Sequence, residues 1–321
     1  MKKLCSIPRV PLSILPTPLY KLENISALLH TNVYIKRDDM TGVALGGNKV
    51  RKLEYLLYDA KAQGADCVLT TGGAQSNHAM LTAACANKLG MKAILILKKR
   101  GVWQKKGNQL LNDLLGANVR FVDTDDYADI YAQMEDMCKD LSRQGRKGYC
   151  IPVGGSVALG SLGYVRCVEE IAAQALQMQT RFTHIVCATG SGGTHAGTAL
   201  GARLYMPDCK VTGVMVDDDP FDKIVPDLMR KTAALLEYEE PIANADVRLL
   251  NMVGPGYAKP SPEGEAAIRT LAQNEGLILD PVYTGKAFAG LLAMAAAGEF
   301  QADDHVIFLH SGGAGGVFAI E

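Results

Sequence analysis

The stretch HIVCATGSGGTHAG, residues 184–197, reads as a strand, a glycine-rich turn and the beginning of a helix. Gly190, Gly192 and Gly193 are three glycines in four positions, which is more than a tight strand-to-helix turn needs. Such a turn brings backbone N–H groups close to an anion, and the helix N-terminus adds positive potential. We therefore predict a phosphate-binding turn, to which Thr194 adds a hydroxyl. Because His195 stands where a dinucleotide fingerprint has its last glycine, a compact cofactor with one phosphate fits better than a pyrophosphate.

Outward from this turn, short β-branched runs alternate with longer helical patterns. This alternation predicts an α/β fold with mainly parallel sheets, and continuous apolar strands suggest sheets that are covered on both faces. We predict strands at 32–38, 67–72, 93–98, 118–123, 149–154, 184–190, 210–216 and 305–310. We predict helices at 50–63, 77–89, 106–115, 127–144, 161–178, 194–204, 263–275 and 285–298.

Length and composition set the class of protein. A chain of 321 residues is long enough for about two domains. A net charge of -1 gives no field that would recruit nucleic acid or an anionic membrane, and no apolar run has membrane-spanning length. The eight cysteines form no C-x-x-C pair, and we see no secretory signal. We therefore expect a cytoplasmic protein with reduced thiols, without a metal site or a disulfide framework.

Three further loops follow predicted strands or stand among turn residues. TGGAQSNHA (71–79) and FLHSGGAGG (308–316) place Ser76, Asn77 and Ser311 where each can cap a helix or hold a ligand. Tyr257 and Tyr283 lie in the turns PGYAKP (255–260) and DPVYTGKA (280–287), where packing and site chemistry are both open interpretations. In α/β sheets ligands gather beyond the carboxyl ends of strands, so these loops are candidates for one site.

The stretch LGGNKVRKL, residues 45–53, places Lys49 at the N-terminal end of a helix, which is unfavourable for a charged ammonium. Burial and the positive helix end both lower the pKa of a lysine below its ordinary value of about 10.4. A neutral lysine amine, a phosphate turn, an asparagine amide and a serine are the groups that pyridoxal 5′-phosphate requires, with the lysine forming a Schiff base. The sequence therefore predicts pyridoxal 5′-phosphate as the cofactor.

The ordered set of motifs resembles the D-cysteine desulfhydrase and 1-aminocyclopropane-1-carboxylate deaminase family of fold-type II pyridoxal-phosphate enzymes. The resemblance runs nearly end to end, through PTPLYKLE, YIKRDDMTG, GGNKVRKLEYLL, GAQSNHA, IPVGGS, GSGGTHAG, DPVYTGKA and HSGGA. It implies a tryptophan synthase β-like fold with two domains, each a mainly parallel sheet flanked by helices. Residues 1–51 and 161–321 would form the large cofactor-binding domain and residues 52–160 a small mobile one. It also implies a homodimer.

The resemblance assigns roles position by position. Lys49 resembles the Schiff-base lysine, Asn77 the partner of the cofactor's ring hydroxyl, and Ser311 the residue that faces the pyridine nitrogen. The phosphate cup would be formed by Gly190, Ser191, Gly192, Gly193 and Thr194. Around the substrate, the resemblance places Gln75, Ser76, Asn77, His78, Tyr257, Tyr283 and Thr284, of which Ser76 and the two tyrosines join Lys49 in catalysis. Lys52 resembles the family's second lysine, with a solvated helix face as the alternative.

Thr284, Ser311 and His78 follow the desulfhydrase pattern, so we expect β-elimination from D-cysteine to pyruvate, sulfide and ammonia. Opening of 1-aminocyclopropane-1-carboxylate is an alternative. The basic segment Lys98 to Lys106 is either a solvated loop or a site that attracts a substrate with a second anionic group. The second interpretation makes L-cysteate, with its sulfonate, a third candidate substrate. The sequence also departs from the family after QSNH, where it reads Ala79, Met80 and Leu81. Asp217 to Asp219 are expected to cap a helix, although they could also repel anionic substrates.

Two other classes of protein remain as alternatives. A dinucleotide-dependent oxidoreductase would use a similar sheet, although His195 counts against it. A catalytically silent protein that binds pyridoxal phosphate or a small amino acid would keep the same residues without turnover.

Overall fold

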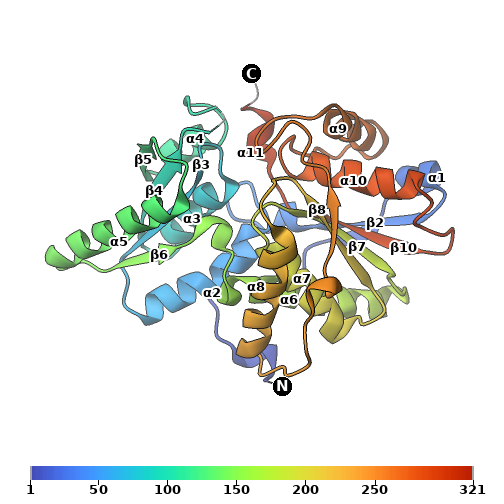
Figure 1. The fold of residues 1–321 in the computed structure, drawn as a ribbon, viewed down its shortest axis with the longest axis horizontal. Coiled ribbons are helices and arrows are strands. Elements are labelled where there is room, and N and C mark those ends of the chain that lie inside the picture. Colours follow the sequence, from blue (N-terminus) through green and yellow to red (C-terminus); the bar gives the residue numbers. More distant parts are fainter. Residues whose placement is uncertain (1, 101, 320–321) are drawn as a thin grey trace.

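The computed structural model describes residues 2–100 and 102–319 of the chain. Its strands form two separate sheets, which Figure 1 shows on the left and right of the molecule. The six-stranded sheet has the order β1 (Leu19–Lys21), β2 (Asn32–Arg37), β10 (His305–His310), β7 (His184–Thr189), β8 (Lys210–Met215) and β9 (Arg248–Asn251). The four-stranded sheet has the order β5 (Asn118–Val122), β4 (Lys92–Lys98), β3 (Cys67–Gly73) and β6 (Gly148–Ile151). Two sheets confirm the predicted two-part α/β architecture, whereas the domain boundaries at 52 and 160 stay a prediction.

Parallel pairing prevails because helices separate successive strands. β1 runs antiparallel to β2, and the other pairings among the described residues are parallel. The helices are α1 (Glu23–Leu29), α2 (Lys49–Ala62), α3 (Asn77–Lys88), α4 (Asn108–Leu114), α5 (Tyr127–Arg143), α6 (Ala158–Met178), α7 (Gly193–Tyr205), α8 (Phe221–Leu235), α9 (Pro262–Glu275), α10 (Thr284–Ala296) and α11 (Ala314–Val317). All seven residues of β3 are buried, as expected for a strand that is covered on both faces.

The sequence analysis predicted no range for the elements α1, α8, α11, β1 and β9 and misread the end of β6. A helix after Asp219 was expected, but no range was predicted for α8, because Pro226 inside it is a signal for a helix end. The short strand β9 was also not predicted. Strand β6 ends at Ile151 and not at residue 154 as predicted, because Pro152 cannot donate a hydrogen bond to a neighbouring strand. The capping role expected for Asp217 to Asp219 is wrong, since Pro220 is the N-cap of α8 and no side chain caps it.

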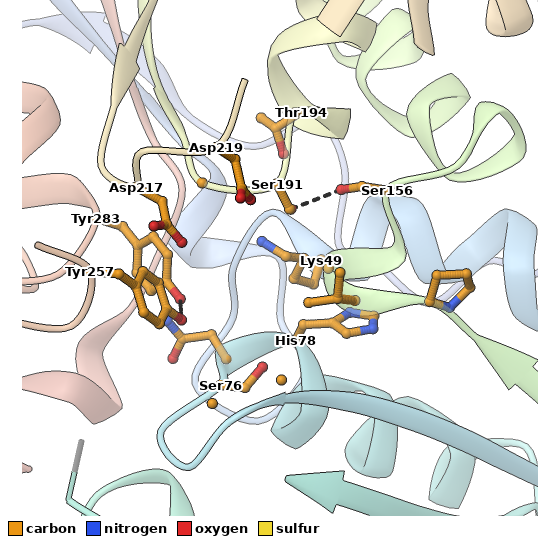
Figure 2. Close-up of a pocket in the computed structure, with 18 of the residues that line it drawn as sticks. Lys49, Ser76, His78, Ser156, Ser191, Thr194, Asp217, Asp219, Tyr257 and Tyr283 are labelled. Atoms are coloured by element: carbon orange, nitrogen blue, oxygen red, sulfur yellow. Dashed lines mark hydrogen bonds between the residues drawn. The ribbon is translucent and has the colours of Figure 1, made fainter. Parts of the chain in front are cut away.

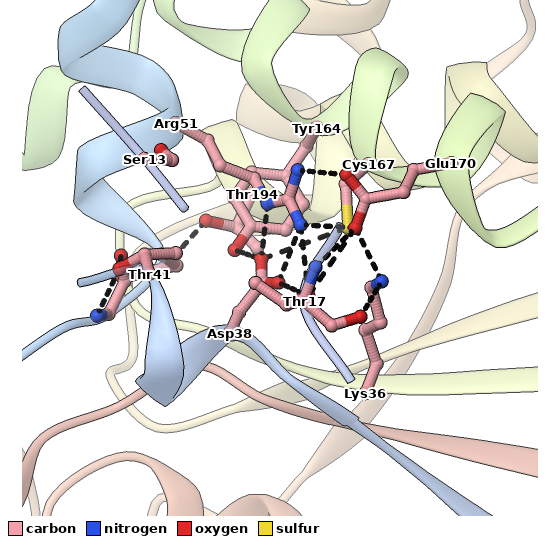
Figure 3. A network of polar contacts seen from close by, with 12 residues as sticks. Ser13, Thr17, Lys36, Asp38, Thr41, Arg51, Tyr164, Cys167, Glu170 and Thr194 are labelled. Atoms are coloured by element: carbon pink, nitrogen blue, oxygen red, sulfur yellow. Dashed lines mark hydrogen bonds and ion pairs between the residues drawn. The ribbon is translucent and has the colours of Figure 1, made fainter. Parts of the chain in front are cut away.

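A buried ionic network fixes the beginning of α2 against β2 and α6 (Figure 3). Arg51 donates two hydrogen bonds of 2.8 Å to the Asp38 carboxylate and two more to Glu170. Lys36 is fully buried and lies 2.5 Å from the same Glu170 carboxylate. The Tyr164 hydroxyl also donates to Asp38, at 2.6 Å. Because charges and hydrogen bonds are satisfied together, this network holds α2 in one position.

Among the described residues, no helix combines the length and the apolar character needed to cross a membrane.

Candidate active site

A cavity of about 450 Å³ lies where loops from both sheets meet (Figure 2). Its walls come from the carboxyl ends of β3, β6, β7, β8 and β10 and from the beginning of α2. The predicted site residues that line it are Lys49, Ser76, Asn77, His78, Gly190, Ser191, Gly192, Thr194, Tyr257, Tyr283 and Ser311. The tertiary structure therefore brings together residues that are up to 262 positions apart in the sequence.

Lys49 is the first residue of α2, and its side chain points into this cavity (Figure 2). Gly47, with a φ of 132°, makes the approach possible, because a Cβ there would lie 3.2 Å from the Ser311 carbonyl oxygen. The Lys49 amine donates to Asn48 Oδ1 at 3.1 Å, and Asn48 in turn donates to the Thr194 hydroxyl at 2.9 Å. Burial lowers the pKa of Lys49 to about 8, against the opposing charge of Asp280.

The glycine turn between β7 and α7 lies beneath a second lysine. Lys52 is fully buried, so the solvated alternative for it is wrong. Its ammonium donates to the Gly154 carbonyl and the Ser156 hydroxyl at 3.2 and 3.1 Å, and among the described residues no carboxylate lies within 4 Å of it. A Cβ at Gly193 would lie 2.9 Å from this ammonium, so the turn and the lysine enclose one small space. Burial and the charge of Lys49 lower the pKa of Lys52 well below its ordinary value.

Tyr257 and Tyr283 form a pair on the opposite wall (Figure 2). Their hydroxyl oxygens are 2.5 Å apart, and the rings meet edge to face with centroids 6.0 Å apart. Lys286, the third residue of α10, donates to the carbonyls of Val253 and Gly256 and so holds the loop that carries Tyr257. Enclosure in the protein raises the pKa of both phenols, so each is protonated at neutral pH.

Three neighbouring residues at the beginning of α3 form the wall from the smaller sheet. The Ser76 hydroxyl oxygen caps α3 by accepting from the Ala79 amide, which leaves its proton free to donate into the cavity. Asn77 Oδ1 accepts from Asn108 at 2.7 Å, so the amide nitrogen remains as the donor of that side chain. His78 is buried, and its Nε2 lies 2.9 Å from the Thr70 hydroxyl while Nδ1 has no partner among the described residues. Ser76 can therefore cap α3 and donate a hydrogen bond to a ligand in the cavity at the same time.

Three predicted residues lie outside this lining. Gln75 lies in an adjoining cavity and uses its amide to hold the 102–108 segment, through Val102, Lys106 and Asn108. The Thr284 hydroxyl donates to buried Asp280, at 2.7 Å. Gly193 lies in the turn itself, where its amide donates to the Ser156 hydroxyl at 3.3 Å. The substrate roles expected of Gln75 and Thr284 stay predictions without a side chain that faces the main cavity.

The cavity is also lined by four carboxylates, none of which is among the predicted site residues. Asp125, Asp217, Asp218 and Asp219 line it together with Lys49, Lys98 and Arg100. Burial raises the pKa of Asp217 to about 6, with a further rise from Asp219, yet this carboxyl is still mostly ionised at pH 7. These four carboxylates face three basic residues of the lining, and Lys52 adds a fourth basic group over the glycine turn. The positions of the four carboxylates at strand ends were a usable signal, but the sequence could not show that they share one cavity.

The basic segment Lys98 to Lys106 does not present a free cluster of positive charge. Lys98 is buried with its ammonium 3.3 Å from the centre of the Tyr127 ring. Three other basic residues pair with nearby aspartates, Lys99 with Asp123, Arg100 with Asp125 and Lys105 with Asp113. Gly101 lies outside the described residues. These pairings give no support to a loop that attracts a second substrate anion.

The chain belongs to the pyridoxal-phosphate dependent enzyme family, whose model matches residues 10–312. Among named relatives, D-cysteine desulfhydrase of Serratia proteamaculans is 42% identical, over 99% of this chain and 97% of that protein. D-cysteine desulfhydrase of Yersinia pestis is 43% identical, over 99% and 97%. A putative 1-aminocyclopropane-1-carboxylate deaminase of Pyrococcus horikoshii is 43% identical, over 98% and 94%.

Solved structures agree with the fold-type II architecture. The crystal structure of an ACC deaminase homologue superimposes with a TM-score of 0.91 and 42% identity, covering 98% of this chain and 94% of the other. The crystal structure of the T.th. threonine deaminase gives a TM-score of 0.66 at 20% identity, covering 92% of each chain, which shows a shared fold.

The residues of this cavity fit pyridoxal phosphate, the cofactor of the family. Within residues 2–100 and 102–319, buried Lys52 has no carboxylate partner, and it overlies the glycine turn, so a phosphate there would supply a negative charge. The backbone of Gly190 to Thr194 and the N-terminus of α7 complete an anion cradle. Lys49 supplies an amine whose pKa is low enough for covalent attachment.

Proposed function

We propose that this chain catalyses β-elimination from a small amino acid with a neutral sulfur leaving group, with D-cysteine as the substrate. One observation carries the proposal: a lysine amine with a pKa of about 8 shares a cavity with a pair of protonated tyrosines. The names of the 42–43% identical relatives supply the substrate. In the reaction, cysteine and water yield pyruvate, sulfide and ammonia.

The side chains divide the work between holding and proton transfer. When bound, pyridoxal phosphate supplies an aldehyde that bonds amines and a ring that accepts electrons from the substrate. Lys49 holds the cofactor, and its neutral amine is a base for the substrate Cα proton. The Tyr257 and Tyr283 hydroxyls donate a proton to the departing sulfur. Ser76 and the Asn77 amide donate hydrogen bonds to oxygens of the substrate and the cofactor ring.

Charge in the cavity favours a leaving group without a second anion. Asp217 to Asp219 place three neighbouring carboxyl groups on the lining, whereas Arg100 is paired with Asp125. L-cysteate would bring a sulfonate into this field, whereas cysteine brings a neutral thiol. Ring opening of 1-aminocyclopropane-1-carboxylate stays as the second candidate, because the Pyrococcus horikoshii relative is equally similar.

A substrate panel tests the proposal. Purified holoenzyme is incubated with D-cysteine, L-cysteine, L-cysteate and 1-aminocyclopropane-1-carboxylate, and 2-oxo acids, sulfide and sulfite are measured. We expect D-cysteine to give the highest kcat/KM with equal amounts of pyruvate and sulfide, and L-cysteate to be the poorer sulfur substrate.

If 2-oxobutyrate were released from 1-aminocyclopropane-1-carboxylate faster than pyruvate from D-cysteine, ring opening would be the main activity in place of β-elimination. A visible band that shifts with every amino acid while no product forms would instead indicate the silent binding protein. We also propose a homodimer and a cytoplasmic location, which sedimentation and cell fractionation would test.

A further inference from the structure

Two cysteine thiols meet on the smaller sheet, outside the cavity lining. Cys138 belongs to α5 and Cys150 to β6, and their sulfur atoms are 3.2 Å apart. Both residues are partly exposed to solvent, whereas Cys67, Cys85, Cys167, Cys187 and Cys209 are buried. Small-molecule oxidants can therefore reach this pair more readily than the buried thiols.

The backbone beneath the pair is shaped to let the sulfurs meet. A Cβ at Gly148 would lie 2.7 Å from the Cys138 sulfur, so a larger residue there would push that thiol away from β6. A disulfide has an S–S distance of about 2.05 Å, so bond formation requires an approach of only about 1 Å. The ring would close over the 12-residue separation of the two positions, from the end of α5 to the next strand.

We propose that Cys138 and Cys150 form a reversible regulatory disulfide whose oxidant is a low-molecular-weight disulfide. One thiolate attacks that disulfide and releases one small thiol, and the second protein thiol then displaces the other. Two protein thiols are oxidised while one small disulfide is reduced to two thiols. Cystine is the natural probe if the enzyme consumes cysteine, a choice that rests on the proposed function.

The crosslink would act on the cavity because both of its anchoring elements reach it. Tyr127 and Tyr131 of α5 line the cavity, and the Tyr131 hydroxyl accepts from the Val153 amide at 3.3 Å. Val153 lies in the turn directly after β6, next to Gly154, whose carbonyl accepts from Lys52. Pulling α5 toward β6 therefore displaces the turn that holds a lysine of the phosphate cradle. We expect the oxidised enzyme to have a lower kcat/KM.

Protonation keeps the pair reduced under mild conditions. Burial, together with the neighbouring Cys138 thiol, raises the pKa of Cys150 to about 12. Because the thiolate is the attacking species, crosslinking is slow at neutral pH and accelerates as the pH rises.

The test treats the holoenzyme with excess cystine, blocks remaining thiols by alkylation, and maps peptides without reduction. We expect a peptide pair joined through Cys138 and Cys150, a loss of kcat/KM, and recovery of both upon reduction with dithiothreitol. Cys138→Ser and Cys150→Ser should keep their activity in cystine. Cys5→Ser, which changes an exposed cysteine elsewhere, should respond like the wild-type protein.

Two results would overturn the proposal. Cystine could leave only mixed disulfides on single cysteines, or the crosslink could form while kcat/KM stays unchanged. The peptide map is independent of the substrate, so its result stands even if D-cysteine is not turned over; activity would then be followed with whichever amino acid the substrate panel identifies.

Discussion

The two faces of α2 hold basic residues in opposite electrostatic settings. On one face, Arg51 is surrounded by the carboxylates of Asp38 and Glu170 (Figure 3). On the other, Lys49 points into the cavity and Lys52 lies over the glycine turn, and both donate to neutral oxygens. Burial disfavours all three cations, but Asp38 keeps the pKa of Arg51 well above its ordinary value, whereas the pKa values of both lysines fall.

The comparison shows how one short helix can hold one cation that stays charged and two lysines whose pKa values are lowered. A buried cation beside carboxylates stays charged and fixes the backbone, because separating the partners would leave a charge unpaired. A buried cation beside neutral groups is less stable as a cation, so it tends toward the free amine or gains from binding an anion. The positions differ by only a residue or two, and the neighbouring strands and helices make the difference.

The largest effect is expected on removal of the reactive amine. Lys49→Ala should lower kcat roughly 10³-fold or more, the scale on which enzymes respond to loss of a covalent nucleophile. Borohydride reduction should then fail to attach the cofactor to the peptide that contains position 49. Lys61→Ala, at an exposed position in the last turn of the same helix, should leave both measurements unchanged. If Lys49→Ala kept the turnover of the wild-type protein and its cofactor could still be trapped by borohydride, Lys49 would not be the Schiff-base lysine.

The anchoring face can be broken separately. Asp38→Ala leaves Arg51 without its main partner and should cost about 3–5 kcal/mol in the free energy of unfolding by denaturant. Asp39→Ala removes the neighbouring carboxylate, which pairs with the partly exposed Arg37, and should cost on the order of 1 kcal/mol or less. Equal losses in the two variants would contradict the anchoring role of the buried network.

The pH dependence of stability gives a further test of the Asp38 network. Burial tends to raise the pKa of Asp38, but the charge of Arg51 outweighs burial and lowers it to about 2. A carboxyl with a folded-state pKa below its unfolded value of about 3.9 stabilises the protein above that unfolded value. This contribution is lost as the pH falls through about 2. The stability gap between wild type and Asp38→Ala should therefore narrow with acid.

The smallest effect is a shift in a titration midpoint. Initial rates of pyridoxal phosphate attachment to the cofactor-free protein, trapped by borohydride, should rise with pH with a midpoint near pH 8 and level off above it. The reason is that the neutral amine reacts, and the folded pKa of Lys49 is about 8 instead of 10.5. Lys49→Ala provides the background rate. A rate that keeps rising toward pH 10.5 would show that the amine is solvated like an ordinary lysine.

Local patterns predicted much of this molecule because their physical causes are local. The apolar run at 93–98 and the glycine turn at 190–194 carry their structural meaning within a few residues. Local patterns did not predict the bounds of helix α8. Pro226 signals the end of a helix unless tertiary packing overrides that signal, and here Pro226 is buried on the side of the helix that faces the core. The position of the Gln75 side chain could not be predicted for another reason: its hydrogen bonds go to a segment about 30 residues away in the sequence.

The sequence by itself determined the alternation of strands and helices, the glycine turn before α7 and the lysine at a helix beginning. Each depends on backbone freedom, hydrophobic period or the helix dipole, which neighbouring residues set. The tertiary structure alone decided that Lys52 lies over that turn, that Asp217 shares its cavity and that two thiols touch. Burial and charge pairing are sums over residues distant in the chain, so they become defined only when the two sheets have folded and packed.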